Sequence, residues 1–395
     1  MSDEYSTDED DGTSSFEGSK AYARGGFHAA YIGEMLGPKR LWRVASKLGF
    51  GVHATAWSVC ASAASRNAPP THAVKIHRAD DDTWREEVDT LMHARGDQGI
   101  LRIAASFDHR GPNGSHGCIV TELEGATVDA AVRSFGALPS WVVMGVARDM
   151  LTGIAALHAR GFVHTDIKPD NVLLRPALSR ALVGAPREMR IFARERKIKP
   201  RHGKAKKPIT IASSSSSAAT ATPTTSANVA GANAAGAALD ESAFGPGTFC
   251  VIGDLGNAEK IKHYPPEPGS IQPRLYRAPE VVAYLPHTEA VDVYSAGAVV
   301  HYAATAGPLF DPDGDTSEER NAEHVRLVAR TLGPFPEYMR LASFVVRAAD
   351  DVVFEPDLLA ASDALWLVRA LTTVDPHERP TAAAAAVAQS PHMVE

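Results

Sequence analysis

The pattern of apolar and polar residues divides the chain into a β-prone part followed by a helical part. Between Leu41 and Ile76, short β-prone runs alternate with turn residues, which predicts a small antiparallel sheet. The apolar spacing within 80–93 predicts one helix, and further strands are expected at about 101–107 and 118–122. This part of the chain therefore predicts a small sheet with one helix packed on it.

After Gly125 the apolar residues recur at helical spacing. Ser140 is a suitable N-cap, and a helix is predicted over 141–159, with Gly161 ending it. Similar patterns recur near 291–306, 322–332, 338–347 and 363–372. The second part of the chain is therefore predicted to be mostly helical.

Two segments carry no periodic apolar face. Residues 1–24 are rich in Ser, Thr, Asp and Glu and are predicted to be a disordered acidic tail. Residues from about 176 to 246 contain a basic stretch at 194–207, a serine run and Ala/Thr/Gly repeats, which predicts a disordered low-complexity insert. The basic stretch is typical either of a nuclear localisation signal or of a solvated charge run.

Composition narrows the class of protein without identifying it. The 395 residues are 44% hydrophobic and 22% charged, which is ordinary for a soluble protein large enough for two lobes. The net charge of -7 argues against general nucleic-acid binding, and no apolar run is expected to reach transmembrane length. The three cysteines, Cys60, Cys118 and Cys250, are far apart and predict reduced, buried thiols.

A polar loop between the helix at 141–159 and an apolar Val-Leu-Leu run carries the clearest chemistry. Asp166, Lys168 and Asn171 have the spacing that phosphoryl transfer requires. Asp166 would orient a hydroxyl, Lys168 would neutralise phosphate charge, and Asn171 would hold a metal ion. His164 is predicted to brace the loop rather than to react.

Asp254 follows another short β-prone run and is predicted to be the second metal ligand. Magnesium favours one or two carboxylates with phosphate oxygens and water, which suits Asp254 together with Asn171. Without the low-complexity insert, the gap between Asp166 and Asp254 falls to roughly twenty residues, a short strand-turn-strand span. The insert therefore interrupts one functional unit.

A nucleotide-binding segment is predicted upstream of this loop. Gly49 and Gly51 flank a tight turn whose backbone can approach phosphates closely. Lys75 lies in the apolar strand Ala73-Val74-Lys75-Ile76, where it would face the nucleotide phosphates and need a carboxylate partner. Glu87 shares a helix face with Leu91 and is the chosen partner, with Glu86 as the alternative.

In their order and spacing, these motifs resemble the eukaryotic protein kinases from about Leu41 to His392. The resemblance implies an α+β, two-lobed fold, with a β-rich N-lobe at 25–122 and a mostly helical C-lobe at 123–395 that carries the insert. It implies ATP and Mg²⁺ as cofactors. Besides the residues above, it implies nucleotide-binding positions at Val52, Ala73, the gatekeeper Thr121, Glu122 and Glu124.

Finer features resemble the SR-protein kinases, which phosphorylate serines in arginine/serine-rich segments of splicing factors. The resemblance is carried by HTDIKPDN, DLGNA, GGFHAAYIGEML and LGFGVHATAW, and by a spacer within the kinase domain. The chain departs from that family at Ala278-Pro279-Glu280, which has the generic kinase form. The alternatives are a pseudokinase scaffold, a kinase with another peptide consensus and a kinase acting on small molecules.

Three further expectations concern regulation, substrate docking and bracing. Thr165 stands where an arginine is usual, which predicts constitutive activity because no cation is present to receive an activation-loop phosphate. Glu280 and Arg379 are expected to pair, and Asp292 is expected to brace the loop. Arginine/serine-rich substrates would dock on acidic residues at Asp313, Asp315, Glu318 and Glu319.

The remaining expectations concern the state of the protein in the cell. It is predicted to be a monomer in the cytoplasm and nucleus, with no direct nucleic-acid or membrane partner. These follow from the moderate charge, the basic stretch at 194–207 and the family resemblance.

Overall fold

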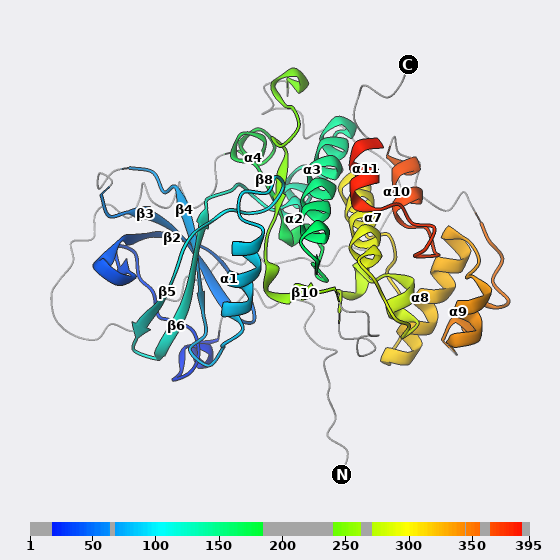
Figure 1. Ribbon diagram of the computed structural model, residues 1–395, viewed down its shortest axis with the longest axis horizontal. Helices are drawn as coiled ribbons and strands as arrows, with labels where there is room; N and C mark the ends of the chain where they lie inside the picture. The colour runs from blue at the N-terminus through cyan, green and yellow to red at the C-terminus, as the bar shows by residue number, and fades with distance from the viewer. Residues whose placement is uncertain are drawn as a thin grey trace, which may run out of the picture.

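The computed structural model describes residues 18–63, 68–184, 240–261, 271–343, 345–355 and 364–388. They form two lobes, a β-sheet lobe early in the chain and a larger helical lobe after it (Figure 1). The predicted α+β, two-lobed fold is confirmed.

The smaller lobe is built on a six-stranded antiparallel sheet with the strand order β1-β2-β3-β4-β6-β5. Apolar side chains on its inner face form a compact core that includes Val44, Val59, Val74 and Val120. The strands are β1 (Met35–Leu36), β2 (Trp42–Phe50), β3 (Ala54–Ala61), β4 (His72–His77), β5 (Ile103–Gly111) and β6 (Gly114–Glu122).

Helix α1 (Trp84–His93) lies beside the sheet and faces the larger lobe (Figure 1). Trp84, Glu87, Thr90 and Leu91 are its buried residues. Glu87 is therefore the one charged residue on the buried face of α1, and its position matters below.

The larger lobe is organised around α3 (Ser140–Ala159), which packs against α7 (Ala290–Thr305) and α11 (Ala382–Ala388). Contrary to the sequence expectation, α3 is long and apolar enough to cross a membrane, but 61% of its most apolar window is buried. Its apolarity is explained by its place in the core. The other helices are α2 (Val128–Phe135), α4 (Pro176–Val183), α6 (Pro279–Val282), α8 (Ser317–Leu332), α9 (Glu337–Ala342) and α10 (Leu365–Leu371).

Two small antiparallel strand pairs frame the polar loop. One joins β7 (Phe162–Val163) to β10 (Glu259–Lys260), and the other joins β8 (Val172–Leu174) to β9 (Cys250–Ile252). The loop leaves β7 and enters β8, so both of its ends are fixed by pairing with the strands that flank Asp254.

The predicted boundaries need three corrections. Pro176–Val183 is a helix that buries Leu178 and Leu182, so the insert does not begin at 176. Described structure also resumes at Asp240, while 185–239 and its basic stretch lie outside the described residues. At the N-terminus a 3₁₀ turn, Ser19–Tyr22, precedes the predicted start at 25.

Local helix signals were also misplaced or missed. The N-cap of α3 is Pro139, and Ser140 is the first helical residue, because the extended backbone of Pro139 ends the preceding loop. Helix α2 was not predicted, although the side chain of Thr127 caps it by accepting a bond from the Ala130 N–H at 3.1 Å. Cys60, Cys118 and Cys250 are buried free thiols, as expected.

Candidate active site

Lys75 lies at the junction of the two lobes and joins three elements. Its ammonium donates to Glu87 Oε2 at 2.8 Å and to Asp254 Oδ1 at 2.5 Å. Glu86 is exposed on the outer face of α1, so the structure places Glu87 against the lysine. Strand β4, helix α1 and the turn after β9 are therefore held together by one cation.

The charges in this cluster stabilise one another. Burial lowers the pKa of Lys75, but the Glu87 and Asp254 carboxylates outweigh it and raise that pKa above its ordinary value. Burial raises the pKa of Asp254, but Lys75 outweighs it and lowers that pKa below its usual range. Both groups are therefore ionised at neutral pH. The Asp254 side chain is 44% exposed, which leaves it open to a ligand.

The polar loop brings its three predicted residues together around one carboxylate. Lys168 Nζ lies 3.0 Å from Asp166 Oδ2. The Asn171 amide donates to the backbone carbonyl of Asp166 at 2.8 Å and to Asp166 Oδ2 at 3.0 Å. Because Asn171 uses its NH₂ group within the loop, its amide oxygen is the atom left for a metal ion.

Asp292 braces the backbone of this loop, as predicted. Its carboxylate accepts hydrogen bonds from the backbone N–H groups of His164 at 2.7 Å and Thr165 at 2.9 Å. It is also hydrogen-bonded to His158 Nε2 at 2.9 Å. Although burial raises the pKa of Asp292, the hydrogen bond and charge of His158 lower it below the usual range. One buried charge thus fixes the start of the loop from helix α7.

His164 acts as the predicted brace. Its Nε2 lies 3.1 Å from the Gly253 carbonyl, and its Nδ1 accepts the Asp166 N–H at 3.3 Å. The Gly253 N–H in turn donates to the Asn171 carbonyl at 2.9 Å. Asn171 and Asp254, the two predicted metal ligands, are therefore held on neighbouring backbone segments.

The glycine turn between β2 and β3 has no structural need for glycine. Neither Gly49 nor Gly51 has a positive φ, and a Cβ added to either would meet nothing within 4 Å. Val52 at its tip is 66% exposed. Open space above a bare backbone is what a close-approaching phosphate requires.

The other predicted nucleotide positions lie at the end of the sheet nearest the larger lobe. Ala73 on β4 is the direct cross-strand partner of Thr121 on β6. Glu122 ends β6, and Glu124 begins the connection to α2. The Glu124 side chain is buried and bonds Arg175 at 2.5 Å, so a nucleotide at this position would have to contact the backbone of the connection.

Sequence reasoning missed two polar residues that hold the loop. The Thr165 hydroxyl donates to the Asn257 carbonyl at 2.6 Å, and Thr165 itself has a φ of 63°. The Thr165 carbonyl accepts the Gln272 N–H at 3.0 Å, and the Gln272 amide reaches Ser295 Oγ at 2.7 Å. Asn257 directly follows the Asp-Leu-Gly motif and could have been found from it, whereas nothing in the sequence pattern marks Gln272.

The oxygen ligands and lysine side chains of this site fit a divalent metal ion and a nucleoside triphosphate. Asp254 and Asn171 offer oxygen ligands, and Lys75 and Lys168 offer cations for phosphate oxygens. A bound metal ion would neutralise the charge that develops on the transferred phosphoryl group. Asp166 would orient the acceptor hydroxyl beside the metal ion and the phosphoryl group.

The comparison with family models identifies the class of protein. The protein kinase domain model matches residues 42–181 and 246–393, so the chain belongs to the protein kinase family. With serine/threonine kinases among its relatives, it is a protein serine/threonine kinase, an enzyme class that uses ATP and a divalent metal ion.

The curated relatives narrow the similarity further. Protein kinase dsk1 of Schizosaccharomyces pombe is 26% identical, over 82% of this chain and 72% of that protein. Serine/threonine-protein kinase SRPK of Physarum polycephalum is 27% identical, over 81% and 73%. Serine/threonine-protein kinase SKY1 of Saccharomyces cerevisiae is 31% identical, over 50% and 28%. The predicted resemblance to SR-protein kinases is confirmed at modest identity.

Proposed function

We propose that this kinase phosphorylates serines in arginine/serine-rich proteins, which dock on the acidic segment at the start of α8. Asp313, Asp315, Glu318 and Glu319 are all exposed there. The start of α8 adjoins the end of the activation segment, because Arg274 donates to Ser317 Oγ at 3.2 Å and to Asn321 Oδ1 at 2.8 Å. A polycationic peptide leaving the active site would meet these acids. Human SRSF protein kinase 3, 29% identical over 40% of this chain, supports the same substrate class.

Glu319 has a separate structural task. Its Oε2 accepts the backbone N–H groups of Asp315 at 2.9 Å and Thr316 at 3.0 Å, while Thr316 Oγ1 accepts the Glu319 N–H at 3.2 Å. This capping box starts helix α8. Changing Glu319 would disturb the helix as well as the charge, so Asp313, Asp315 and Glu318 are the docking residues to test.

The test reverses these three charges and leaves Glu319 in place. The triple variant Asp313→Lys, Asp315→Lys and Glu318→Lys should raise KM for an arginine/serine peptide by tenfold or more, by about 1.4 kcal/mol or above. The KM for ATP should stay unchanged. A matched variant reverses three exposed acids elsewhere on the larger lobe, Glu241, Asp351 and Glu378. Equal KM values for all three proteins would refute the docking proposal without touching the kinase assignment.

A second proposal is that the enzyme is active without activation-loop phosphorylation. In place of an arginine awaiting a phosphate, Thr165 makes a neutral bond to the Asn257 carbonyl, and its own carbonyl holds Gln272. These bonds fix both flanks of the activation segment from the polar loop. No added charge is needed to order them.

Phosphatase treatment of the purified kinase should leave kcat unchanged. The Thr165→Ala variant should lower kcat several-fold, because the hydrogen bond from the Thr165 hydroxyl to the Asn257 carbonyl is lost. Thr152→Ala is the matched control, since Thr152 makes a similar hydroxyl-to-carbonyl bond to Arg148 at 2.8 Å inside α3. Loss of activity after phosphatase treatment would show that a phosphate is required after all.

Magnesium is the proposed metal, because the ligands offered by Asp254 and Asn171 are oxygens and leave room for water and phosphate. Activity should return to the metal-depleted enzyme with Mg²⁺ but not with Ca²⁺, whose longer bonds and higher coordination number suit this ligand pair poorly. Full activity with Ca²⁺ alone would contradict the assignment.

The enzyme is proposed to act as a monomer in both the cytoplasm and the nucleus. The nuclear part of this proposal rests on the basic stretch at 194–207 of the sequence. Replacing its lysines and arginines by glutamine in a fluorescent fusion should shift the protein toward the cytoplasm. An unchanged distribution would leave the stretch as a solvated charge run.

A further inference from the structure

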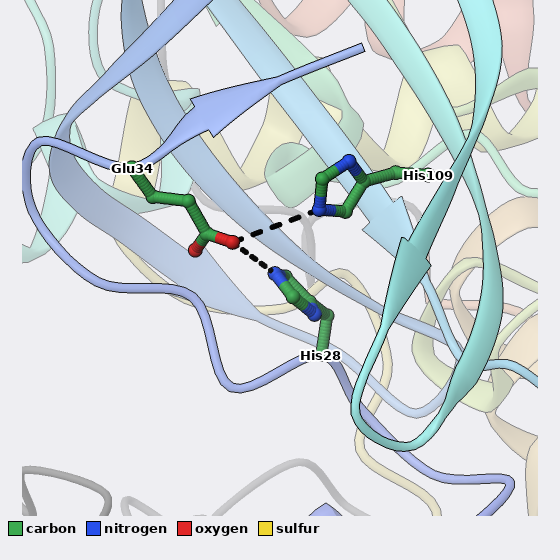
Figure 2. Close-up of side chains that lie close together, drawn as sticks. All are labelled: His28, Glu34 and His109. Atoms are coloured by element: carbon green, nitrogen blue, oxygen red, sulfur yellow. Dashed lines mark hydrogen bonds and ion pairs between the residues drawn. The ribbon is translucent and has the colours of Figure 1, made fainter. Parts of the chain in front are cut away.

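A second cluster of metal-ligating side chains lies in the smaller lobe, away from the active site. His28 comes from the segment before the sheet, Glu34 directly precedes β1, and His109 lies on β5 (Figure 2). Strands β1 and β5 are the two opposite edges of the six-stranded sheet. The cluster therefore links two edge strands, β1 and β5, that do not pair with each other in the described sheet.

The three side chains converge on one point. His28 Nε2 lies 3.0 Å and His109 Nε2 lies 3.6 Å from the same oxygen, Glu34 Oε1, as Figure 2 shows. The ligand atoms of all three residues lie within 4.8 Å of one another. In a tetrahedral zinc site with bonds of about 2.0 Å, neighbouring ligand atoms are separated by about 3.3 Å. The distances from Glu34 Oε1 to His28 Nε2 and to His109 Nε2, 3.0 and 3.6 Å, lie on either side of that value.

Buried imidazole rings pack closely around this cluster. His28 is 2% exposed, yet its Nδ1 has no partner among the described residues, and neither has Nε2 of the adjacent buried His116. The His28 ring lies 4.9 Å from that of His109 and 5.1 Å from that of His116. A divalent ion bound by Nε2 of His28 and Nε2 of His109 would at the same time contact the Glu34 carboxylate.

Glu34 lies in a shielded position. Its side chain is 12% exposed and that of His109 16%, so a cation bound here would be largely shielded from water. Imidazole ligands favour zinc-class transition metals over Mg²⁺ and Ca²⁺.

We infer that His28, Glu34 and His109 form a binding site for a zinc-class divalent cation. The fourth position would be left to water, as in zinc sites with three protein ligands. The cation would fasten the N-terminal segment and β1 to β5. The same surfaces already touch there, since a Cβ on Gly37 would lie 3.0 Å from the Phe107 ring.

The test measures metal binding directly, on the full chain in excess Mg²⁺, which occupies oxygen-ligand sites. Titration with Co²⁺ should produce the visible absorption bands of a tetrahedral ion at one equivalent, and Zn²⁺ should abolish them. Zn²⁺ should also raise the melting temperature of the protein. Glu34→Gln and His109→Gln should each weaken Co²⁺ binding by at least tenfold, since even outer-shell changes cost ~10–100-fold.

His93→Gln is the matched control, because His93 is 52% exposed on α1 and lies outside the cluster. It should bind Co²⁺ as the unchanged chain does. Absence of the tetrahedral bands would overturn the inference, and so would bands that persist unchanged in Glu34→Gln and His109→Gln. If those variants lower the melting temperature equally with and without Zn²⁺, the cluster is a hydrogen-bonded brace and the inference fails.

Discussion

Two glutamate–cation pairs in this kinase have the same chemistry but differ in their exposure to solvent. Lys75 and Glu87 meet at the junction of the lobes, where the lysine is 29% exposed and also binds Asp254. Glu280 and Arg379 are both 0% exposed, and the guanidinium makes two bonds to the carboxylate, at 2.8 and 3.1 Å. The first pair joins strand β4 to helix α1 beside Asp254 of the larger lobe, and the second lies inside the larger lobe.

The surroundings of the arginine explain the difference. Arg379 also donates to the backbone carbonyls of Ala290 at 2.7 Å and Thr373 at 3.0 Å, and its guanidinium lies 5.2 Å from the Tyr294 ring. Every donor is used within the protein, so no ligand can compete for them. Lys75, in contrast, shares its charge with a carboxylate that is open to a ligand. We therefore expect stability to depend on the arginine pair and activity on the lysine pair.

The largest expected effect is on stability, from Arg379→Met. Removing the arginine leaves Glu280 as a buried, unpaired charge, which should cost about 3–5 kcal/mol in the free energy of unfolding. Urea denaturation followed by circular dichroism measures it, with the exposed Arg347→Met as control. A loss below 1 kcal/mol would show that the buried pair does not hold the lobe together.

The next effect is on activity, from Lys75→Met. Loss of the cation facing the phosphates should lower kcat by about 10²–10³-fold, as for other electrostatic groups of active sites. The melting temperature should fall less than in Arg379→Met, because His77 Nε2 remains 3.6 Å from the Glu87 carboxylate. Lys260→Met, an exposed lysine on β10, is the control. A variant that keeps its kcat would contradict the role given to Lys75.

The smallest effect concerns Asp292, a buried charge that serves the polar loop. Asp292→Asn should lose about 1.5 kcal/mol of stability at pH 7, the lower end for hydrogen bonds to charged groups. Because the folded-state pKa of Asp292 lies below its ordinary value of 3.8, its contribution is fully present above that pH. It is lost as the pH falls through the lower folded-state pKa.

The stability difference between the unchanged chain and Asp292→Asn should therefore shrink as the pH falls below 3.8. Chemical denaturation at a series of pH values measures it. A difference that stays constant down to pH 2 would mean that the charge of Asp292 contributes nothing and that only its shape matters.

Short-range patterns in the sequence predicted much of the site. Spacing identified Asp166, Lys168 and Asn171, and a helix-face argument chose Glu87, which the structure places against Lys75. Residues that act through long-range backbone contacts could not be predicted this way. Gln272 holds Thr165 and Ser295 from a proline-rich segment, and only the fold brings them together.

The fold was predicted well where apolar periodicity is strong and poorly at its interruptions. The helix over Ser140–Ala159 was found, whereas α4 was assigned to the insert because its single short apolar face adjoins low-complexity sequence. The histidine cluster was not predicted at all, because the edge-to-edge curl of the sheet brings together residues far apart in the chain.

The pairing of β8 with β9 has a consequence for the length of the chain between them. Leu174 lies opposite Cys250, and the Arg175 N–H donates to the Phe249 carbonyl at 2.9 Å, so the two ends of the intervening sequence meet at one place. For a flexible loop, the entropy of closure grows only with the logarithm of its length, and doubling the length costs about 0.6 kcal/mol. A change in the number of residues between the two strands should therefore cost little, while the strand pairing keeps Asn171 and Asp254 in place.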